Sequence, residues 1–334
     1  MEQSQAVLTG TEAVARVERT IAADAVARDP AVAEGLAMAG VRAASLLEGP
    51  SGGAADGVAV SEASCVHHVH APPGHERGGA FELAAGSVQQ ATDHCLAAHL
   101  LSRRLGRAGI CSLAPSLAKD LNLVSVPEPG LIAALLAADA GASEPDAGPE
   151  RILDLAREVL RVVGDRTARP ANLVELQGDR AAEVVLVASG ADTTPAREAA
   201  RALAEAGVAA SALSVILVRP VPMAEVREAL KASRAVFVVP APGEPSALLA
   251  RVRGVVDEKA EVHPLAATDP AQMIEAVRQH LPAGSFEEHK LAAAPLEAPS
   301  RRLVIAPEGP GGEETARRTL AALGHLVALR VGRS

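Results

Sequence analysis

The chain has 334 residues, of which 49% are apolar, and a net charge of −9 at pH 7. This length allows about two or three domains, whose cores must be aliphatic because the chain has three Phe and no Trp or Tyr. The acidic balance, with no block of Lys and Arg, argues against a nucleic-acid partner and against anionic membrane surfaces.

The cysteines and the N-terminus indicate the compartment. Cys65, Cys95 and Cys111 include no C-x-x-C pair, so we expect them to form neither a disulfide framework nor a ligand set for zinc or an iron–sulfur cluster. The opening "MEQSQAVLTG" lacks the basic and apolar regions of a signal peptide, and no uncharged stretch is long enough to cross a bilayer. We therefore expect a cytoplasmic protein without membrane insertion.

The first chemical feature along the chain is a set of acidic residues in "AADAVARDPAVAEG". Asp24, Asp29 and Glu34 have helix-like spacing, and general acid–base chemistry would need such carboxylates desolvated in a cleft. Beside Arg28, on a helix, they are more typical of a solvated face.

A second feature, "SCVHHVHAPPGH", holds four of the ten histidines. In a strand, His68 and His70 would point to one face and His67 to the other, so at most a pair and His75 could meet at a metal ion. The lone His94 and His99 would need a separate helix to bring them near. The pattern favours histidines on a partly exposed strand, and we predict no metal site.

Apolar strand-like runs then alternate with Ala-rich helical runs, which is typical of an α/β fold with a mostly parallel sheet. The clearest units lie in residues 181–282, where "AEVVLVASG", "SALSVILVRPVP" and "RAVFVVPAP" are predicted strands separated by helices. Residues 141–180, rich in Gly, Pro and Asp around the helix "RILDLAREVLRVV", are predicted to be a linker. Residues 1–140 would then form a first domain.

The C-terminal residues 283–334 are predicted to be a linker and a truncated βαβ tail. Gly309, Gly311 and Gly312 precede a helix and are candidates for binding a phosphate group through backbone N–H groups. Two glutamates follow in the first helical turn, where they complement the helix dipole and repel an anion. This arrangement favours a capped helix start over a nucleotide site.

The run "GHERGGAFELAAGSVQQATDHCLAAHLLSRRLG" resembles the first domain of pyruvate:ferredoxin oxidoreductase and related thiamine-diphosphate 2-oxoacid:acceptor oxidoreductases. Residues 181–281 are similar to the second domain of this family, which is related to the transketolase C-terminal domain, and the tail resembles the start of the third. The resemblance implies a thiamine-diphosphate-binding-like parallel-sheet domain, degenerate in its pyrimidine-type site, then a transketolase C-terminal-like domain and a γ-domain-like tail. The residues that match in the first run are Gly79, Phe81, Leu83, Ser87, Val88, Gln89 and the tract 97–100.

The chain departs from the family at the positions that carry chemistry. The glutamate that activates the thiamine ring falls on Val26, which cannot relay a proton, and the arginine that binds the substrate carboxylate falls on Pro72. The substrate loop Tyr-Pro-Ile-Thr-Pro-Ser is missing, and "APSLAKD" replaces a second substrate segment. No G-D-G…N motif for a diphosphate-bound Mg²⁺ occurs; the family carries it on a separate β module.

We interpret the chain as a non-catalytic structural or assembly subunit, of α type, in a 2-oxoacid:ferredoxin oxidoreductase complex, and expect it to be inactive alone. Two alternatives remain: an active α subunit using Asp29 and His70 as substitute catalytic residues, or a free small-molecule sensor. The expected partners are β-type and iron–sulfur subunits. Thiamine diphosphate, Mg²⁺ and iron–sulfur clusters are expected on those partners, with no cofactor bound by this chain alone.

Overall fold

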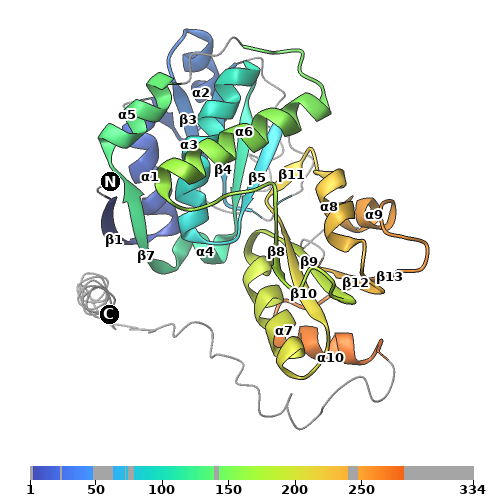
Figure 1. The fold of residues 1–334 in the computed structure, drawn as a ribbon. Helices are drawn as coiled ribbons and strands as arrows, with labels where there is room; N and C mark the ends of the chain where they lie inside the picture. Colours follow the sequence, from blue (N-terminus) through green and yellow to red (C-terminus); the bar gives the residue numbers. More distant parts are fainter. Residues whose placement is uncertain are drawn as a thin grey trace.

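Two α/β domains lie side by side, each built on its own sheet (Figure 1). The computed structural model describes residues 3–22, 25–47, 63–71, 73, 79–138, 143–239 and 247–281. The predicted βαβ tail, including Gly309, Gly311 and Gly312, lies outside these ranges.

The first domain contains a six-stranded sheet in the order β11-β5-β6-β4-β3-β2. All neighbouring strands are parallel except β11, which runs antiparallel to β5. The carboxyl ends of β3 to β6 therefore meet at one edge of the sheet, where ligands of parallel α/β sheets usually bind. The strands are β2 (Val26–Ala27), β3 (Ala43–Leu47), β4 (Cys65–Val69), β5 (Phe81–Ala85), β6 (Gly109–Leu113) and β11 (Leu217–Arg219).

Two helices, α1 (Gly10–Ile21) and α3 (Val88–Leu105), pack against each other beside this sheet. A capping box between Thr9 and Glu12 begins α1. The hydroxyl of Ser87 accepts a hydrogen bond from the Gln90 backbone N–H and so begins α3. Fourteen α3 residues are buried, which fixes this helix in the domain centre.

Ser87 and Gln89, which carry the family resemblance, have structural roles here. Besides the Ser87 cap, the Gln89 side chain donates to the Ser125 carbonyl at 3.0 Å and accepts from the Ser125 N–H at 2.8 Å. This pair of hydrogen bonds ties α3 to β7 (Leu121–Pro127), which forms a separate antiparallel ribbon with β1 (Gln3–Thr9). The remaining helices are α2 (Pro30–Met38), α4 (Pro115–Lys119) and α5 (Pro129–Ala138).

The segment expected as a linker, residues 141–180, is integrated into both domains over its described part, residues 143–180. Its helix α6 (Pro149–Thr167) buries an apolar stripe, including Ile152, Val159 and Leu160, in the first core against α3. The following strand β8 (Val174–Gly178) pairs antiparallel with β10 at the edge of the second sheet. The Gly- and Pro-rich composition of this segment predicted a linker, so the packing of α6 and the pairing of β8 were missed.

The second domain holds a five-stranded sheet in the order β13-β12-β9-β10-β8, parallel except for β8. Alternate side chains of β9 point to opposite faces: Leu186 joins the core under α7 and α10, and Val187 joins the core under α8 and α9. The elements are β9 (Val184–Ser189), η1 (Gly190–Asp192), α7 (Thr193–Glu205), β10 (Ala210–Val215), α8 (Met223–Leu230), β12 (Ala235–Val238), α9 (Ala247–Arg253), β13 (Glu261–Pro264) and α10 (Pro270–Arg278).

The predicted strand "SALSVILVRPVP" is divided between the two sheets. Its first part is β10, which lies between β9 and the edge strand β8 of the second sheet, and its second part is β11, which crosses to pair with β5 of the first sheet. Leu217 is fully buried in the first core, so a single apolar run serves two domains and joins them.

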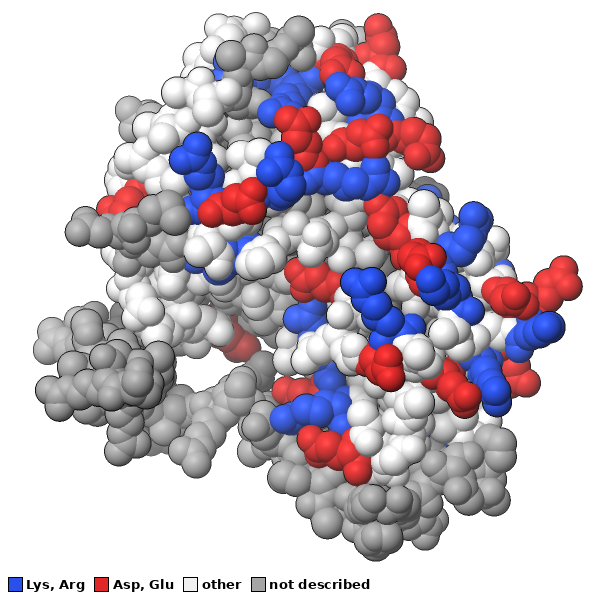
Figure 2. All heavy atoms as spheres, in the orientation of Figure 1, with Lys and Arg blue, Asp and Glu red and all other residues white. Residues whose placement is uncertain are grey.

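Acidic and basic side chains are intermixed on the face shown in Figure 2, with several pairs along α6. Arg151 pairs with Glu144 and Arg157 with Glu225, and the latter pair links α6 to α8. Within the described ranges, no helix has the length and apolar character needed to cross a membrane.

Candidate functional site

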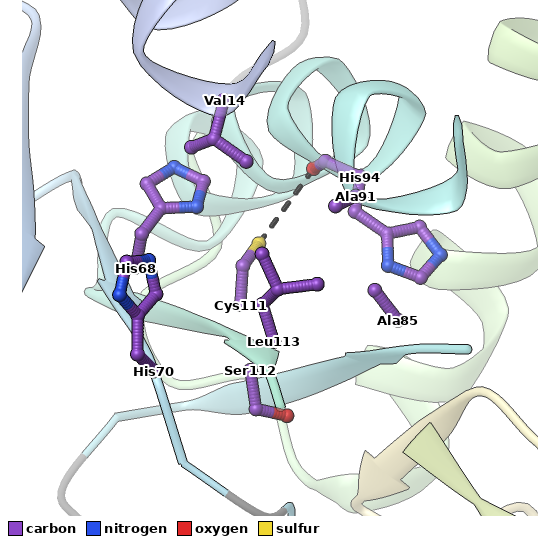
Figure 3. Close-up of a pocket in the computed structure, with 9 residues that line it drawn as sticks. All are labelled: Val14, His68, His70, Ala85, Ala91, His94, Cys111, Ser112 and Leu113. Carbon is purple, nitrogen blue, oxygen red and sulfur yellow. Dashed lines mark hydrogen bonds between the residues drawn. The ribbon is translucent and has the colours of Figure 1, made fainter. Parts of the chain in front are cut away.

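A small pocket lies at the carboxyl ends of β4, β5 and β6, between the sheet and helices α1 and α3 (Figure 3). It has space for about one water molecule. Its position is the one expected for the active site of a parallel α/β domain. The lining residues are Val14, His68, His70, Ala85, Ala91, His94, Cys111, Ser112 and Leu113.

The histidines of β4 and of the residue that follows it alternate between the faces of the sheet, as the sequence pattern predicts. His68 and His70 both line the pocket, whereas His67 lies on the opposite face. None of these rings is exposed: His67 has 0%, His68 3% and His70 8% exposure. The expected partly exposed strand is therefore a buried strand covered on both faces.

Glu18 of α1 is the centre of a buried hydrogen-bond network beside the pocket. Its Oε1 lies 2.7 Å from His68 Nε2, and its Oε2 lies 2.7 Å from His99 Nε2. Burial would raise the pKa of the Glu18 carboxyl, but the positive potential and the hydrogen bonds of the two imidazoles hold it well below its usual range. The carboxylate is thus ionised in a fully buried position.

His94 and Cys111 form the other side of the pocket, where the Cys111 Sγ lies 3.8 Å from the His94 carbonyl (Figure 3). His94 is buried, and its Nδ1 has no hydrogen-bond partner in the part of the chain that the structure describes. Burial, and next the charge of His68, lower the pKa of His94 to about 4. The ring is therefore neutral at pH 7, and its Nδ1 faces space that suits a water molecule.

A second polar group lies on the opposite face of β4. His67 Nδ1 is 2.8 Å from the Ser45 hydroxyl, and its Nε2 is 3.3 Å from Cys65 Sγ and 3.5 Å from Glu34 Oε1. Burial, followed by the charge of His68, lowers the pKa of His67 to about 4. Burial and the Glu34 charge raise the pKa of the Cys65 thiol to about 12, so this thiol is not a ready nucleophile.

The structure separates the two catalytic candidates taken from the sequence. Asp29 begins α2, where its carboxylate accepts a hydrogen bond of 2.9 Å from the Ala31 N–H, a capping interaction. Asp29 follows β2, whereas His70 follows β4, and β3 lies between these two strands. Neighbouring strands are about 4.8 Å apart, so the backbones of β2 and β4 are about 10 Å apart.

Sequence reasoning missed Glu18 as a site residue. Glu18 lies 50 residues from His68 and 81 from His99 along the chain, so no local motif joins them. One signal was present: α1 is strongly amphipathic, and Glu18 falls on its apolar face beside Val14, Val17 and Ile21. A carboxylate in an apolar stripe predicts a buried partner.

Comparison with known proteins supports the fold and the second domain. Residues 182–277 match the sequence model of the family described as "Pyruvate:ferredoxin oxidoreductase core domain II". A 2-oxoglutarate:ferredoxin oxidoreductase from Magnetococcus marinus, solved with 2-oxoglutarate, coenzyme A and succinyl-CoA bound, superposes with a TM-score of 0.59 at 15% identity. That comparison covers 82% of this chain but 65% of the other, so the chain spans less than two thirds of its relative.

A split-gene transketolase, described as an inactive β4 tetramer, superposes with a TM-score of 0.50 at 13% identity, over 81% of this chain and 97% of the other. No curated protein matches the chain in sequence. The α/β fold class, with its thiamine-enzyme-like and transketolase-like architecture, is confirmed. The resemblance to pyruvate:ferredoxin oxidoreductase is confirmed as well.

The described residues fit thiamine diphosphate poorly. Val26, at the position implied for the activating glutamate, lies on the short edge strand β2 and has no ionisable group. The pocket at the carboxyl edge has space for about one water, and none of the described residues that line it is a lysine or arginine that would bind a diphosphate or a 2-oxoacid carboxylate. We therefore derive no chemical step through this cofactor.

Proposed function

We propose that the chain is a non-catalytic α-type subunit of a 2-oxoacid:acceptor oxidoreductase complex. The observation that carries the proposal is the small pocket at the carboxyl ends of β4, β5 and β6, where the described residues of a family-like fold leave space for about one water molecule. The close packing of η1 against β5 and β6 at the same edge also supports the proposal. A Cβ added to Gly86 after β5 would lie 2.2 Å from Thr193 Oγ1.

In this proposal, the redox groups belong to partner subunits. The three cysteines are buried on β4, α3 and β6, and they are fewer than the four thiolates that an iron–sulfur cluster usually needs. Partners of β type and iron–sulfur type would hold thiamine diphosphate, Mg²⁺ and the clusters. This subunit would contribute packing surfaces to the complex.

The proposal is tested by affinity capture of the tagged full chain from its own cells, followed by a visible absorption spectrum of the captured complex. We expect iron–sulfur absorption from co-purified subunits and reduction of an acceptor that depends on a 2-oxoacid. Calorimetry of the purified chain with Mg²⁺ and thiamine diphosphate should show no binding. Capture of the chain alone would contradict the proposal and favour a free sensor, and micromolar binding of thiamine diphosphate would also contradict it.

The active-subunit alternative is tested with Asp29→Asn and His70→Ala in the assembled complex. We expect both variants to keep the steady-state rate within about twofold, because neither side chain would take part in proton transfer. General acid–base residues typically contribute about 10²–10⁴ in rate. A loss of about a hundredfold with Asp29→Asn would show that the chain is catalytic.

A further inference from the structure

The Glu18 network includes a third kind of metal-binding group, the thiol of Cys95. Cys95 precedes His99 by one turn of α3, so both side chains face α1. Among the described residues, Glu18, His68 and Cys95 are the group of three whose candidate ligand atoms all lie within 4.8 Å of one another. All three residues are fully buried or nearly so.

We propose that Glu18, His68 and Cys95 bind one divalent transition-metal ion, best matched by Zn²⁺. A carboxylate, an imidazole and a thiolate form a mixed set that suits Zn²⁺ rather than the oxygen-seeking Mg²⁺ or Ca²⁺. With the carboxylate and thiolate each carrying one negative charge, the ion and its ligands are electrically neutral, as a buried site requires.

The geometry is close to that of a bound site. Zinc lies about 2.0–2.3 Å from such ligand atoms, which places neighbouring ligands about 3.5 Å apart. The three atoms are within 4.8 Å of one another, so side-chain movements of about 1 Å are sufficient. His68 Nε2 and Glu18 Oε1, now 2.7 Å apart, would separate by less than about 1 Å to receive the ion.

His99 supplies the outer contact that a ligating carboxylate usually has. Its Nε2 lies 2.7 Å from Glu18 Oε2, which leaves Oε1 to face His68. Outer-shell hydrogen bonds of this kind orient first-shell ligands and tune their affinity. His99 is therefore a positioning residue in the proposed site.

An ion here would join α1, β4 and α3 through one point, in the centre of the first domain. This role is independent of the proposed subunit function, and it departs from the sequence-based expectation that the chain holds no metal. The sequence-based hypothesis considered His68 with His70 and His75. The proposed site keeps only His68 from that group.

The test uses the full chain, which is unfolded in denaturant in the presence of a chelator and then refolded in metal-free buffer. The refolded chain is titrated with Co²⁺, which serves as a spectroscopic probe for Zn²⁺. We expect one equivalent of Co²⁺ to give a thiolate-to-cobalt charge-transfer band, Zn²⁺ to displace it, and Zn²⁺ to raise the melting temperature. Elemental analysis of chain purified without chelator should give about one zinc per molecule.

Variants identify the ligands. Cys95→Ser should abolish the charge-transfer band, whereas the matched variant Cys65→Ser, on the other face of β4, should retain it. If Cys95→Ser does not fold, the wild-type titration still decides. A refolded wild-type chain with native circular dichroism that binds no Co²⁺ or Zn²⁺ would overturn the proposal, as would a band that persists in Cys95→Ser.

Discussion

The two domains differ sharply in what they bury. Every buried carboxylate, imidazole and thiol among the described residues lies between Glu18 and Cys111, in the first domain. The buried polar side chains of the second domain are hydroxyl groups alone: Ser189, Thr193, Ser211, Ser214 and Ser233. The second domain is thus an aliphatic scaffold, and the first contains ionisable groups in its core.

This difference concerns the free energy of burying ionisable groups. Burying an ionisable group costs free energy unless hydrogen bonds or opposite charges compensate it. The first domain carries this cost at several positions, although its pocket has little space. The Glu18 network compensates part of this cost through its hydrogen bonds, and the ion proposed above would compensate it further.

The largest effect that we expect is selective loss of the first domain at acidic pH. His67 and His94 have folded-state pKa values of about 4 against an ordinary value of 6.5. Between these values the unfolded chain binds more protons, so the free energy of unfolding falls as the pH falls from 6.5 to 4, by about 3 kcal/mol for each ring. Glu18, with its lowered pKa, adds a loss only below its ordinary value of 4.5.

Burial raises the carboxyl pKa values of Glu34 and Asp93, so these two groups bind protons more readily in the folded chain. They therefore oppose part of this loss of stability as the pH falls. Hydrogen–deuterium exchange at pH 7 and pH 4.5 distinguishes the domains, with rates corrected for the intrinsic effect of pH. Peptides from α1, α3 and β4 should lose protection, and peptides from β9 and β10 should keep it. Equal losses in both domains would contradict the comparison.

The next effect isolates the Glu18 network. Glu18→Leu leaves His68 and His99 without their acceptor, and removing one partner of a buried ionic pair typically costs about 3–5 kcal/mol. The matched substitution in the second domain is Ser211→Ala, which removes one hydrogen bond to the Asp179 carbonyl and should cost about 1 kcal/mol. Urea unfolding followed by circular dichroism measures both, and similar costs would remove the distinction between the two interiors.

Sequence patterns predicted the second domain well because its interior is aliphatic. Runs such as "AEVVLVASG" become β9 with η1, and "RAVFVVPAP" contains β12. The first domain was harder, because its central contacts join residues far apart in the chain. Glu18, His68 and His99 come from three separate elements, so no local sequence pattern shows that their side chains meet.

Helix α3 gives a second example of this limit. Its Ala-rich sequence suggests close packing with another element, and such packing is also compatible with a docking surface on a partner subunit. The structure buries Ala97 and Leu101 inside the first domain, each with 1% exposure. The neighbouring element that they contact is part of the same chain, and no local pattern distinguishes these two kinds of burial.

A smaller effect concerns the contact between the domains. Gly86 follows β5, and a Cβ there would lie 2.2 Å from Thr193 Oγ1 and 3.0 Å from the Gly190 carbonyl. Gly86→Ala must push η1 away from the first sheet, and overpacking of this kind typically costs about 1–3 kcal/mol. We expect a lower urea midpoint, and an unchanged midpoint would mean that the two domains do not hold each other closely in solution.

The smallest effect is expected for Gly35→Ala, which serves as the control for Gly86. Gly35 lies inside α2, where an added Cβ meets nothing within 4 Å, so alanine should stabilise the chain by about 0.5–1 kcal/mol through helix propensity. Thermal unfolding of the purified chain measures this gain.

The helix α2 also exposes Val32 at 53% and Met38 at 75%, so the same variant should be tested in the captured complex. A variant that stabilises the isolated chain but weakens its capture of partners would place a subunit contact on α2. Destabilisation of the isolated chain would show that the backbone at Gly35 is not an ordinary α-helix.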